Sequence, residues 1–158
     1  MVFSSITFLF YFLPIVLIIY YLVPNKYKNA VLLISSFAFY FYGEPKNIYI
    51  MIFSIIFTYI FGILIDKYRG KKYDKIFLIL SISISIGLLI YFKYADFIIK
   101  NINLWLSNKL DLIHVILPIG ISFYTFQMIS YIADVYRGEA KVQKNIFKLA
   151  TYVSLFPQ

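Results

Sequence analysis

The sequence predicts an all-α polytopic membrane protein with about five transmembrane helices and additional interfacial amphipathic helices. Hydrophobic residues make up 62% of the chain and charged residues only 14%, a balance far more apolar than that of soluble domains. The apolar residues are gathered into runs whose lengths suit helices that cross a bilayer. The 16 tyrosines and 17 phenylalanines fit helices whose ends pass through two membrane interfaces.

The first two predicted spans lie before a turn signal at residues 43–46. The first covers residues 3–23, and Pro14 inside it should kink the helix, which membrane helices tolerate when neighbours satisfy the freed backbone. The second covers residues 27–42, but its apolar part would reach only roughly 20 Å against a hydrocarbon core of ~30 Å. It can span only where the bilayer is thinned or where flanking polar residues enter the interface.

The remaining segments alternate between spans and amphipathic helices. Three further spans are predicted over residues 48–65, 76–92 and 113–136. Residues 96–112 place apolar and polar side chains on opposite sides of a helix, which is typical of a helix lying flat at the membrane interface. Residues 145–156 form a second short amphipathic helix. An odd number of spans followed by such a helix indicates the front part of a longer transmembrane domain.

The distribution of positive charge predicts the topology. The chain has 15 basic and 7 acidic residues, and the basic residues lie between the apolar runs rather than in one nucleic-acid-binding block. Eleven Lys and Arg residues follow the first, third and fifth spans, against four after the second and fourth. By the positive-inside rule the first set is cytoplasmic and the N-terminus lies outside. The expected partner of these charges is the lipid bilayer, and no nucleic acid is expected.

One predicted span carries polar side chains along one side. At 100° per residue, five residues of the span over 113–136 fall within about 80° of one another on a helical wheel. They are Gly120, Tyr124, Gln127, Tyr131 and Asp134. The opposite side is apolar.

This polar stripe has two interpretations. Its side chains can tie neighbouring helices together through hydrogen bonds. Alternatively, it lines a polar cavity or tunnel, with Gly120 allowing a close approach and Pro118 setting the helix start or a kink. In either case Asp134 lies near the helix end, where Arg137 at i+3 can pair with it.

The sequence offers no catalytic residue and no metal site of its own. Ser122 follows the first glycine of a G-x-S-x-G pattern, but Tyr124 stands where the last glycine must be, and the motif also needs a strand-to-helix turn. The chain has no cysteine, and its one histidine, His114, is expected to be a polar tip at the interface. Nucleophile–base pairs, phosphate-binding loops and metal-ligand spacings are missing.

Several stretches together resemble a known family. Residues 117–127 read Leu-Pro-Ile-Gly-Ile-Ser-Phe-Tyr-Thr-Phe-Gln, and residues 130–138 contain Ser-Tyr, then Asp-Val-Tyr-Arg-Gly. Phe-Tyr-Gly at 41–43, Tyr-Phe-Lys-Tyr at 91–94 and Ser-Leu-Phe-Pro-Gln at 154–158 agree as well. On these motifs the chain resembles the membrane-bound O-acyltransferases (MBOAT), in the branch of the alginate O-acetyltransferases, over its whole length.

The resemblance implies an enzyme that passes an acyl group, usually acetyl, through a tunnel to a cell-surface polysaccharide. The donor is an acetyl thioester or an acyl-carrier protein on the cytoplasmic side, and no tightly bound cofactor is expected. The polysaccharide or teichoic-acid modification machinery acts on the outer side of the cell membrane. The family's catalytic histidine lies beyond Gln158, so the chain of residues 1–158 is expected to be an inactive N-terminal fragment.

The resemblance implies that this chain forms part of the tunnel wall and does not contain the reaction centre. Gly120, Tyr124, Gln127, Tyr131 and Asp134 are expected to line the tunnel as substrate-binding residues. Structural positions of the family's motifs fall on Pro118, Ser122, Arg137, Gly138, Pro157 and Gln158. The alternative that the residues leave open is a non-catalytic small membrane subunit or half of a transporter, since transporters also use polar stripes and broken helices.

Overall fold

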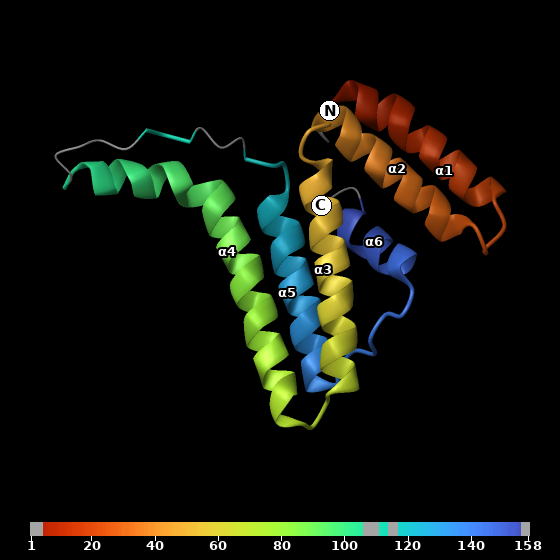
Figure 1. Ribbon diagram of the computed structural model, residues 1–158. Helices are drawn as coiled ribbons and strands as arrows, with labels where there is room; N and C mark the ends of the chain where they lie inside the picture. Colours follow the sequence, from red (N-terminus) through yellow and green to blue (C-terminus); the bar gives the residue numbers. More distant parts are fainter. Residues whose placement is uncertain (1–4, 106–110, 114–116, 156–158) are drawn as a thin grey trace.

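The structure is a computed structural model that describes residues 5–105, 111–113 and 117–155, and these ranges contain helices and no strand (Figure 1). This confirms the predicted all-α class for the described residues. In chain order the helices are η1 (Phe8–Phe12), α1 (Leu13–Leu22), α2 (Lys28–Gly43), α3 (Ile48–Lys67), α4 (Lys72–Asn103), α5 (Ile121–Arg137) and α6 (Ile146–Ser154).

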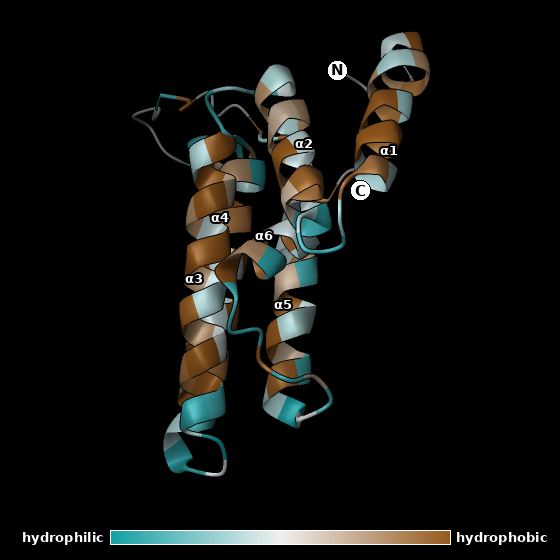
Figure 2. Ribbon diagram, turned by 90° about the vertical axis from the view of Figure 1, so that its right-hand side faces the viewer, coloured by the Kyte–Doolittle hydropathy of each residue, from teal (hydrophilic) through white to brown (hydrophobic). Residues whose placement is uncertain are grey.

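Helices α3, α4 and α5 pack side by side along most of their length (Figure 1). Among the described residues, α3 and α4 are long and apolar enough to cross a membrane, judged by length and composition. Phe8–Leu22 is a shorter apolar helix. The three packed helices are hydrophobic in their middle and hydrophilic at the end where the α3–α4 turn lies (Figure 2).

The helix changes type just before Pro14, where the sequence predicts a kink. Residues Phe8–Phe12 form a π-helix, which passes into α1 with Pro14 in the first turn of the regular helix. Proline has no N–H and its ring collides with the carbonyl four residues earlier in a regular α-helix. The wider π turn relieves this conflict, so the apolar segment continues to Leu22.

One face of helix α6 is buried against the rest of the protein. Leu149, Ala150, Thr151 and Val153 are all buried, and α6 packs against α2 and α3 with further contact to α5 (Figure 1). Helix α2 itself has only slight direct contact with α3, so α6 fills the space between them. The segment predicted to lie at the membrane interface over 145–156 therefore turns its apolar side to protein in this structure.

Helix α4 joins two elements that the sequence separates. The predicted span over 76–92 and the start of the predicted interfacial helix are one continuous helix, whose last part bends and extends away from α5 and α3 (Figure 1). The predicted bound of 112 was wrong, because the helix ends at Asn103 and residues 111–113 are not helical. Asp96 holds the returning chain, since its Oδ1 accepts a hydrogen bond from the Ile113 amide at 3.0 Å.

Helix α5 begins later than the predicted start at residue 113. The Ile121 amide donates to the Pro118 carbonyl at 3.2 Å, and Gly120 has φ +74° and ψ 3°, as required at the third position of a type II turn. Nothing lies within 4 Å of the position that a Gly120 Cβ would take, so the glycine serves this turn rather than a close approach. Pro118 is fully buried and sets the helix start.

The other end of α5 is capped by a second glycine and by a cation from the α3–α4 turn. Gly138 has φ +82°, and its left-handed backbone lets the Glu139 and Ala140 amides donate to the Asp134 carbonyl. The Arg69 guanidinium donates to the Val135 carbonyl, which places a positive charge at the negative end of the helix dipole. The two basic turns, residues 68–71 and 138–145, therefore meet at the same end of the protein.

Replacing Gly138 with alanine is expected to lower the free energy of unfolding by about 1–2 kcal/mol, because a Cβ is strained at this positive φ. The change is measured by equilibrium unfolding in mixed micelles. The control is Gly87→Ala, since Gly87 lies inside α4 with open space around its Cβ position. That variant should be equal to the wild type or more stable by up to about 1 kcal/mol. If both substitutions lowered the free energy of unfolding equally, Gly138 would not owe its role to its left-handed backbone.

Candidate functional site

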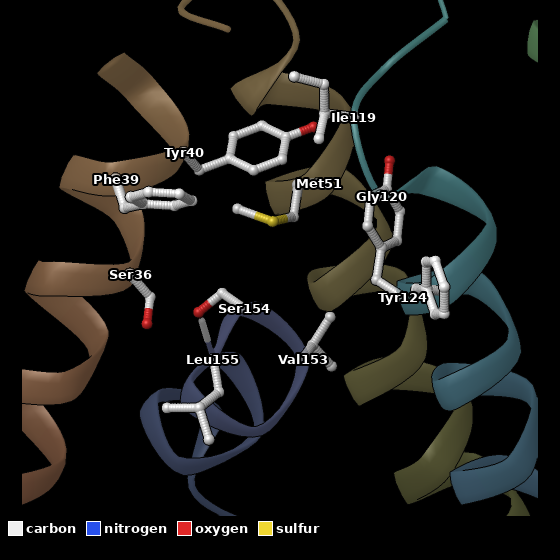
Figure 3. Close-up of a pocket in the computed structure, with 11 residues that line it drawn as sticks. Ser36, Phe39, Tyr40, Met51, Ile119, Gly120, Tyr124, Val153, Ser154 and Leu155 are labelled. Carbon is white, nitrogen blue, oxygen red and sulfur yellow. The ribbon is translucent and has the colours of Figure 1, made fainter. Parts of the chain in front are cut away.

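A cavity of about 60 Å³ lies where α2, the start of α3, the start of α5 and the end of α6 meet (Figure 3). Most of its surface is apolar, with a few hydroxyl groups. The lining residues are Ser36, Phe39, Tyr40, Met51, Ile119, Gly120, Phe123, Tyr124, Val153, Ser154 and Leu155. Four segments that are distant in sequence thus build one small chamber.

Three hydroxyl groups of this chamber are buried without a hydrogen-bond partner. They belong to Tyr40, Tyr124 and Ser154, and the Tyr124 side chain is only 3% exposed. Figure 3 shows the Tyr40 and Tyr124 hydroxyls at one end of the cavity and the Ser154 hydroxyl at the other. Buried polar groups in native proteins are nearly always hydrogen-bonded. Three buried hydroxyls without a partner around one cavity therefore indicate that a binding partner is missing.

A carboxylate closes the tyrosine end of the chamber. Glu44 Oε2 accepts hydrogen bonds from the Asn47 side chain at 2.7 Å and from the Ile119 amide at 3.0 Å. It thereby joins the α2–α3 turn to the turn that precedes α5. A smaller adjoining cavity is lined by Tyr40, Glu44 and Ile119 among others, so the carboxylate lies beside Tyr40.

Three residues of the polar stripe, Tyr124, Gln127 and Tyr131, lie close to α6 or to the loop that precedes it. Gly120 and Tyr124 line the 60 Å³ chamber. One turn further on, the Gln127 side chain donates from Nε2 to the Tyr152 carbonyl of α6 at 2.8 Å. The Tyr131 hydroxyl accepts from the Gln143 amide at 2.9 Å. The Gln127 contact is an inter-helix hydrogen bond of the kind that one interpretation of the stripe predicts, whereas the Tyr131 contact ties α5 to the loop that precedes α6.

A second cavity, of about 220 Å³, lies beyond Gln127 toward the other end of α5. Its lining combines two lysines with polar and aromatic groups. The residues are Tyr131, Lys141, Gln143, Lys148, Leu149 and Tyr152. The stripe therefore has a cavity on each side of the Gln127–Tyr152 hydrogen bond, and Tyr131 is the stripe residue in the second one.

Asp134 and Arg137 do not form the expected ion pair. Among the described residues the ion pair at this end of the protein joins Arg69 to Asp66 at 3.5 Å. Asp134 contributes its backbone carbonyl to the cap of α5 instead. Ser122 lies half-buried in the first turn of α5. His114, Pro157 and Gln158 are outside the described residues.

Sequence reasoning missed Tyr40 and treated Ser154 only as part of a motif. Both complete the chamber with Tyr124. A signal was present in α2, because Ser36 and Tyr40 are four residues apart and so share a helix face. Nothing in the sequence, however, brings that face opposite the start of α5.

Within the described ranges, no group of three acidic, histidine or cysteine side chains is placed to hold a metal ion. The chemistry of the chamber is that of neutral hydrogen-bond donors in an apolar surround. Its lining contains hydroxyl groups but no histidine, lysine or carboxylate that could activate one.

Comparison with known proteins gives consistent matches. The chain is 40% identical over 163 residues to a probable alginate O-acetylase AlgI of Pseudomonas syringae pv. tomato, covering 99% of this chain and 31% of that protein. The same protein of Pseudomonas aeruginosa is also 40% identical, with the same coverage. A peptidoglycan O-acetyltransferase of Helicobacter pylori is 32% identical over 148 residues, covering 90% of this chain and 28% of that protein.

The chain thus spans about a third of the length of the curated relatives it matches. No family model matches the chain, and no solved structure matches it.

Proposed function

We infer that the chain is part of a membrane-bound O-acyltransferase of the alginate O-acetylase branch, which transfers acetyl groups to a cell-surface polysaccharide. The observation that carries this proposal is the 40% identity to alginate O-acetylases over 99% of the chain. The more distant similarity to a peptidoglycan O-acetyltransferase supports acetyl transfer to a polysaccharide as the shared activity. The acceptor can be alginate, peptidoglycan, teichoic acid or another glycan.

The proposed topology has five crossings of the cell membrane and an N-terminus on the outside. Its support is the apolar composition of α3 and α4 and the meeting of two basic turns at one end, where Arg69 caps α5. That end is proposed to be cytoplasmic, where the acetyl thioester or acyl-carrier protein delivers its group. The opposite end, which contains Glu44 and Pro118, then faces the modification machinery outside.

In this scheme the chain supplies part of the acyl path and not the reaction centre. Gly120, Tyr124, Gln127, Tyr131 and Asp134 are proposed as its wall, with a cavity on each side of Gln127. The family resemblance places the catalytic histidine elsewhere in the complete protein, where general-base help is typically worth about 10²–10⁴-fold. The chain itself binds no cofactor tightly in this proposal.

The test is an acetyl-transfer assay on membranes that contain either the complete protein or residues 1–158 alone. Labelled acetyl thioester is supplied on the cytoplasmic side, and acetyl esters on the glycan are measured. The complete protein should transfer acetyl groups and the 158-residue chain should not. Transfer by the short chain would show that catalysis lies within it, and no transfer by the complete protein would overturn the proposed function.

The wall assignment is tested in the complete protein with Gln127→Leu. Loss of the amide removes the donor that holds the Tyr152 carbonyl beside the path, and acetyl transfer per folded protein is expected to fall about tenfold. Tyr131→Leu should also lower acetyl transfer per folded protein. The matched control is Ser130→Leu, because Ser130 is exposed on the same helix and should leave the rate unchanged. Normal rates in both wall variants, at normal expression, would remove these residues from the path.

A further inference from the structure

The fold does not explain the three buried hydroxyls around the 60 Å³ cavity. Neighbouring hydroxyls in the described residues do find partners: Ser54 donates to the Ile50 carbonyl and Tyr59 to the Lys144 carbonyl. Tyr40, Tyr124 and Ser154 do not, although their oxygen atoms are fully shielded by protein. Each hydroxyl can donate one hydrogen bond and can also accept, and the Tyr40 and Tyr124 hydroxyls lie close enough to interact with each other. A group with an acceptor atom placed between them would satisfy both donors.

The charge of the surroundings limits that acceptor to a neutral group. No cationic side chain is among the residues that line the cavity, and Glu44 lies beside Tyr40 in the adjoining one. An anion would be placed near a carboxylate in a poorly solvated site without a counter-charge, which is unfavourable. A carbonyl oxygen meets the requirement, because it is neutral and has two lone pairs for the two tyrosine donors.

The size of the cavity limits the ligand further. One water molecule needs about 10–15 Å³ of such space, so a 60 Å³ chamber holds roughly four non-hydrogen atoms. An acetyl group, with three, fits this space. The apolar walls formed by Met51, Val153 and Leu155 suit the methyl end of such a group.

We propose that this chamber is a binding site for the acetyl group in transit, with its carbonyl oxygen held by the Tyr40 and Tyr124 hydroxyls and its methyl group against Met51 and Val153. The inference rests on the proposed function and adds to it the position that holds the acyl group and limits its length. Tyr40 and Tyr124 are binding residues in this assignment and take no part in bond formation.

The first test measures acyl-chain selectivity in membranes that contain the complete protein. Acetyl-coenzyme A and propionyl-coenzyme A are supplied in turn, and the ratio of propionyl to acetyl transfer is determined. Val153→Ala enlarges the methyl end of the chamber and should raise this ratio about tenfold, the order of discrimination that one methylene provides. The ratio is internal to each sample, so a smaller amount of folded protein does not change it.

The matched control is Val135→Ala. Val135 is fully buried, like Val153, but it packs with Ile65 and Ile132 far from the chamber. The two variants lose the same atoms from equally buried positions. The proposal therefore expects a changed ratio in Val153→Ala alone.

The second test removes one donor and compares binding with stability. Tyr124→Phe should raise the KM for the acetyl donor about threefold to tenfold, the effect of one neutral hydrogen bond. Without ligand the same change removes an unpartnered buried hydroxyl, so the unfolding temperature should stay equal or rise. Tyr49→Phe is the control, because Tyr49 is 74% exposed on α3 and should alter neither quantity.

The outcomes separate the two proposals. A wild-type protein that transfers acetyl from neither coenzyme A nor acyl-carrier protein overturns the proposed function, and this inference falls with it. Transfer by the wild type with unchanged ratios in Val153→Ala overturns the inference alone. A lowered unfolding temperature in Tyr124→Phe with an unchanged KM also overturns it, because the chamber would then hold structural water only.

Discussion

Replacing Leu149 with alanine is expected to lower the free energy of unfolding by about 2 kcal/mol. Leu149 is 2% exposed and lies on α6 in a cluster shared with Leu33, Ile55 and Met128. Leucine-to-alanine changes in soluble cores cost about 2–5 kcal/mol, from lost transfer energy and from the cavity that remains. The lower value is expected here because lipid is itself apolar, so mainly the packing part is lost.

The measurement is denaturant unfolding of the purified protein in mixed micelles. Phe147→Ala is the control on the same helix, because Phe147 is 68% exposed and its loss should change the free energy of unfolding by at most about 0.5 kcal/mol. If Leu149→Ala and Phe147→Ala behaved alike, α6 would be a helix lying on the surface and not one packed between α2 and α3.

Replacing Gly62 with leucine is expected to destabilise the protein by about 1–3 kcal/mol through overpacking. A Cβ at Gly62 would already lie 3.4 Å from Tyr131 Cε1 and 3.5 Å from its hydroxyl, with Val142 at 3.6 Å. The three further carbon atoms of leucine have no room unless Tyr131 moves. Its movement breaks the hydrogen bond from the Gln143 amide, which leaves that amide without its partner.

The same substitution at Gly87 is the control for this effect. Nothing lies within 4 Å of a Gly87 Cβ, so Gly87→Leu gains helix propensity without a collision. Circular dichroism and unfolding in micelles should show Gly87→Leu at or above wild-type stability. Under the proposed function, Gly62→Leu in the complete protein should also reduce acetyl transfer, since it displaces Tyr131 beside the second cavity. Wild-type stability of Gly62→Leu would exclude the close contact between α3 and α5.

The helical class and the starts of most apolar helices could be predicted from the sequence because they depend on local pattern. The role of Gly120 in the turn before α5 could not be predicted in this way. Gly120 was expected to permit close packing, whereas it supplies a positive φ. A glycine in an apolar segment is compatible with either role, and only the backbone conformation decides between them. For the same reason the late start of α5 at Ile121 could not be read from a continuous apolar run.

Helix α6 shows the limit of amphipathic patterns. Its periodicity predicts one apolar face, and the structure has that face buried through Leu149 and Val153. The pattern does not say whether a membrane interface or protein covers the face, because both are apolar partners. The chamber could not be predicted from the sequence for a related reason. Tyr40 and Ser154 come together only through the packing of α6 against α2.

The position of α6 also sets an order of events during synthesis at the ribosome. Helices α1 and α2 form a hairpin whose main further partner is α6, and α2 touches α3 only slightly. Over a hundred residues separate the end of α2 from α6. At about 5–20 residues per second, roughly 5–20 seconds pass between the synthesis of the hairpin and that of its partner. During that interval the hairpin is a free-standing unit, open to capture by insertion chaperones or by the hairpin of another nascent chain.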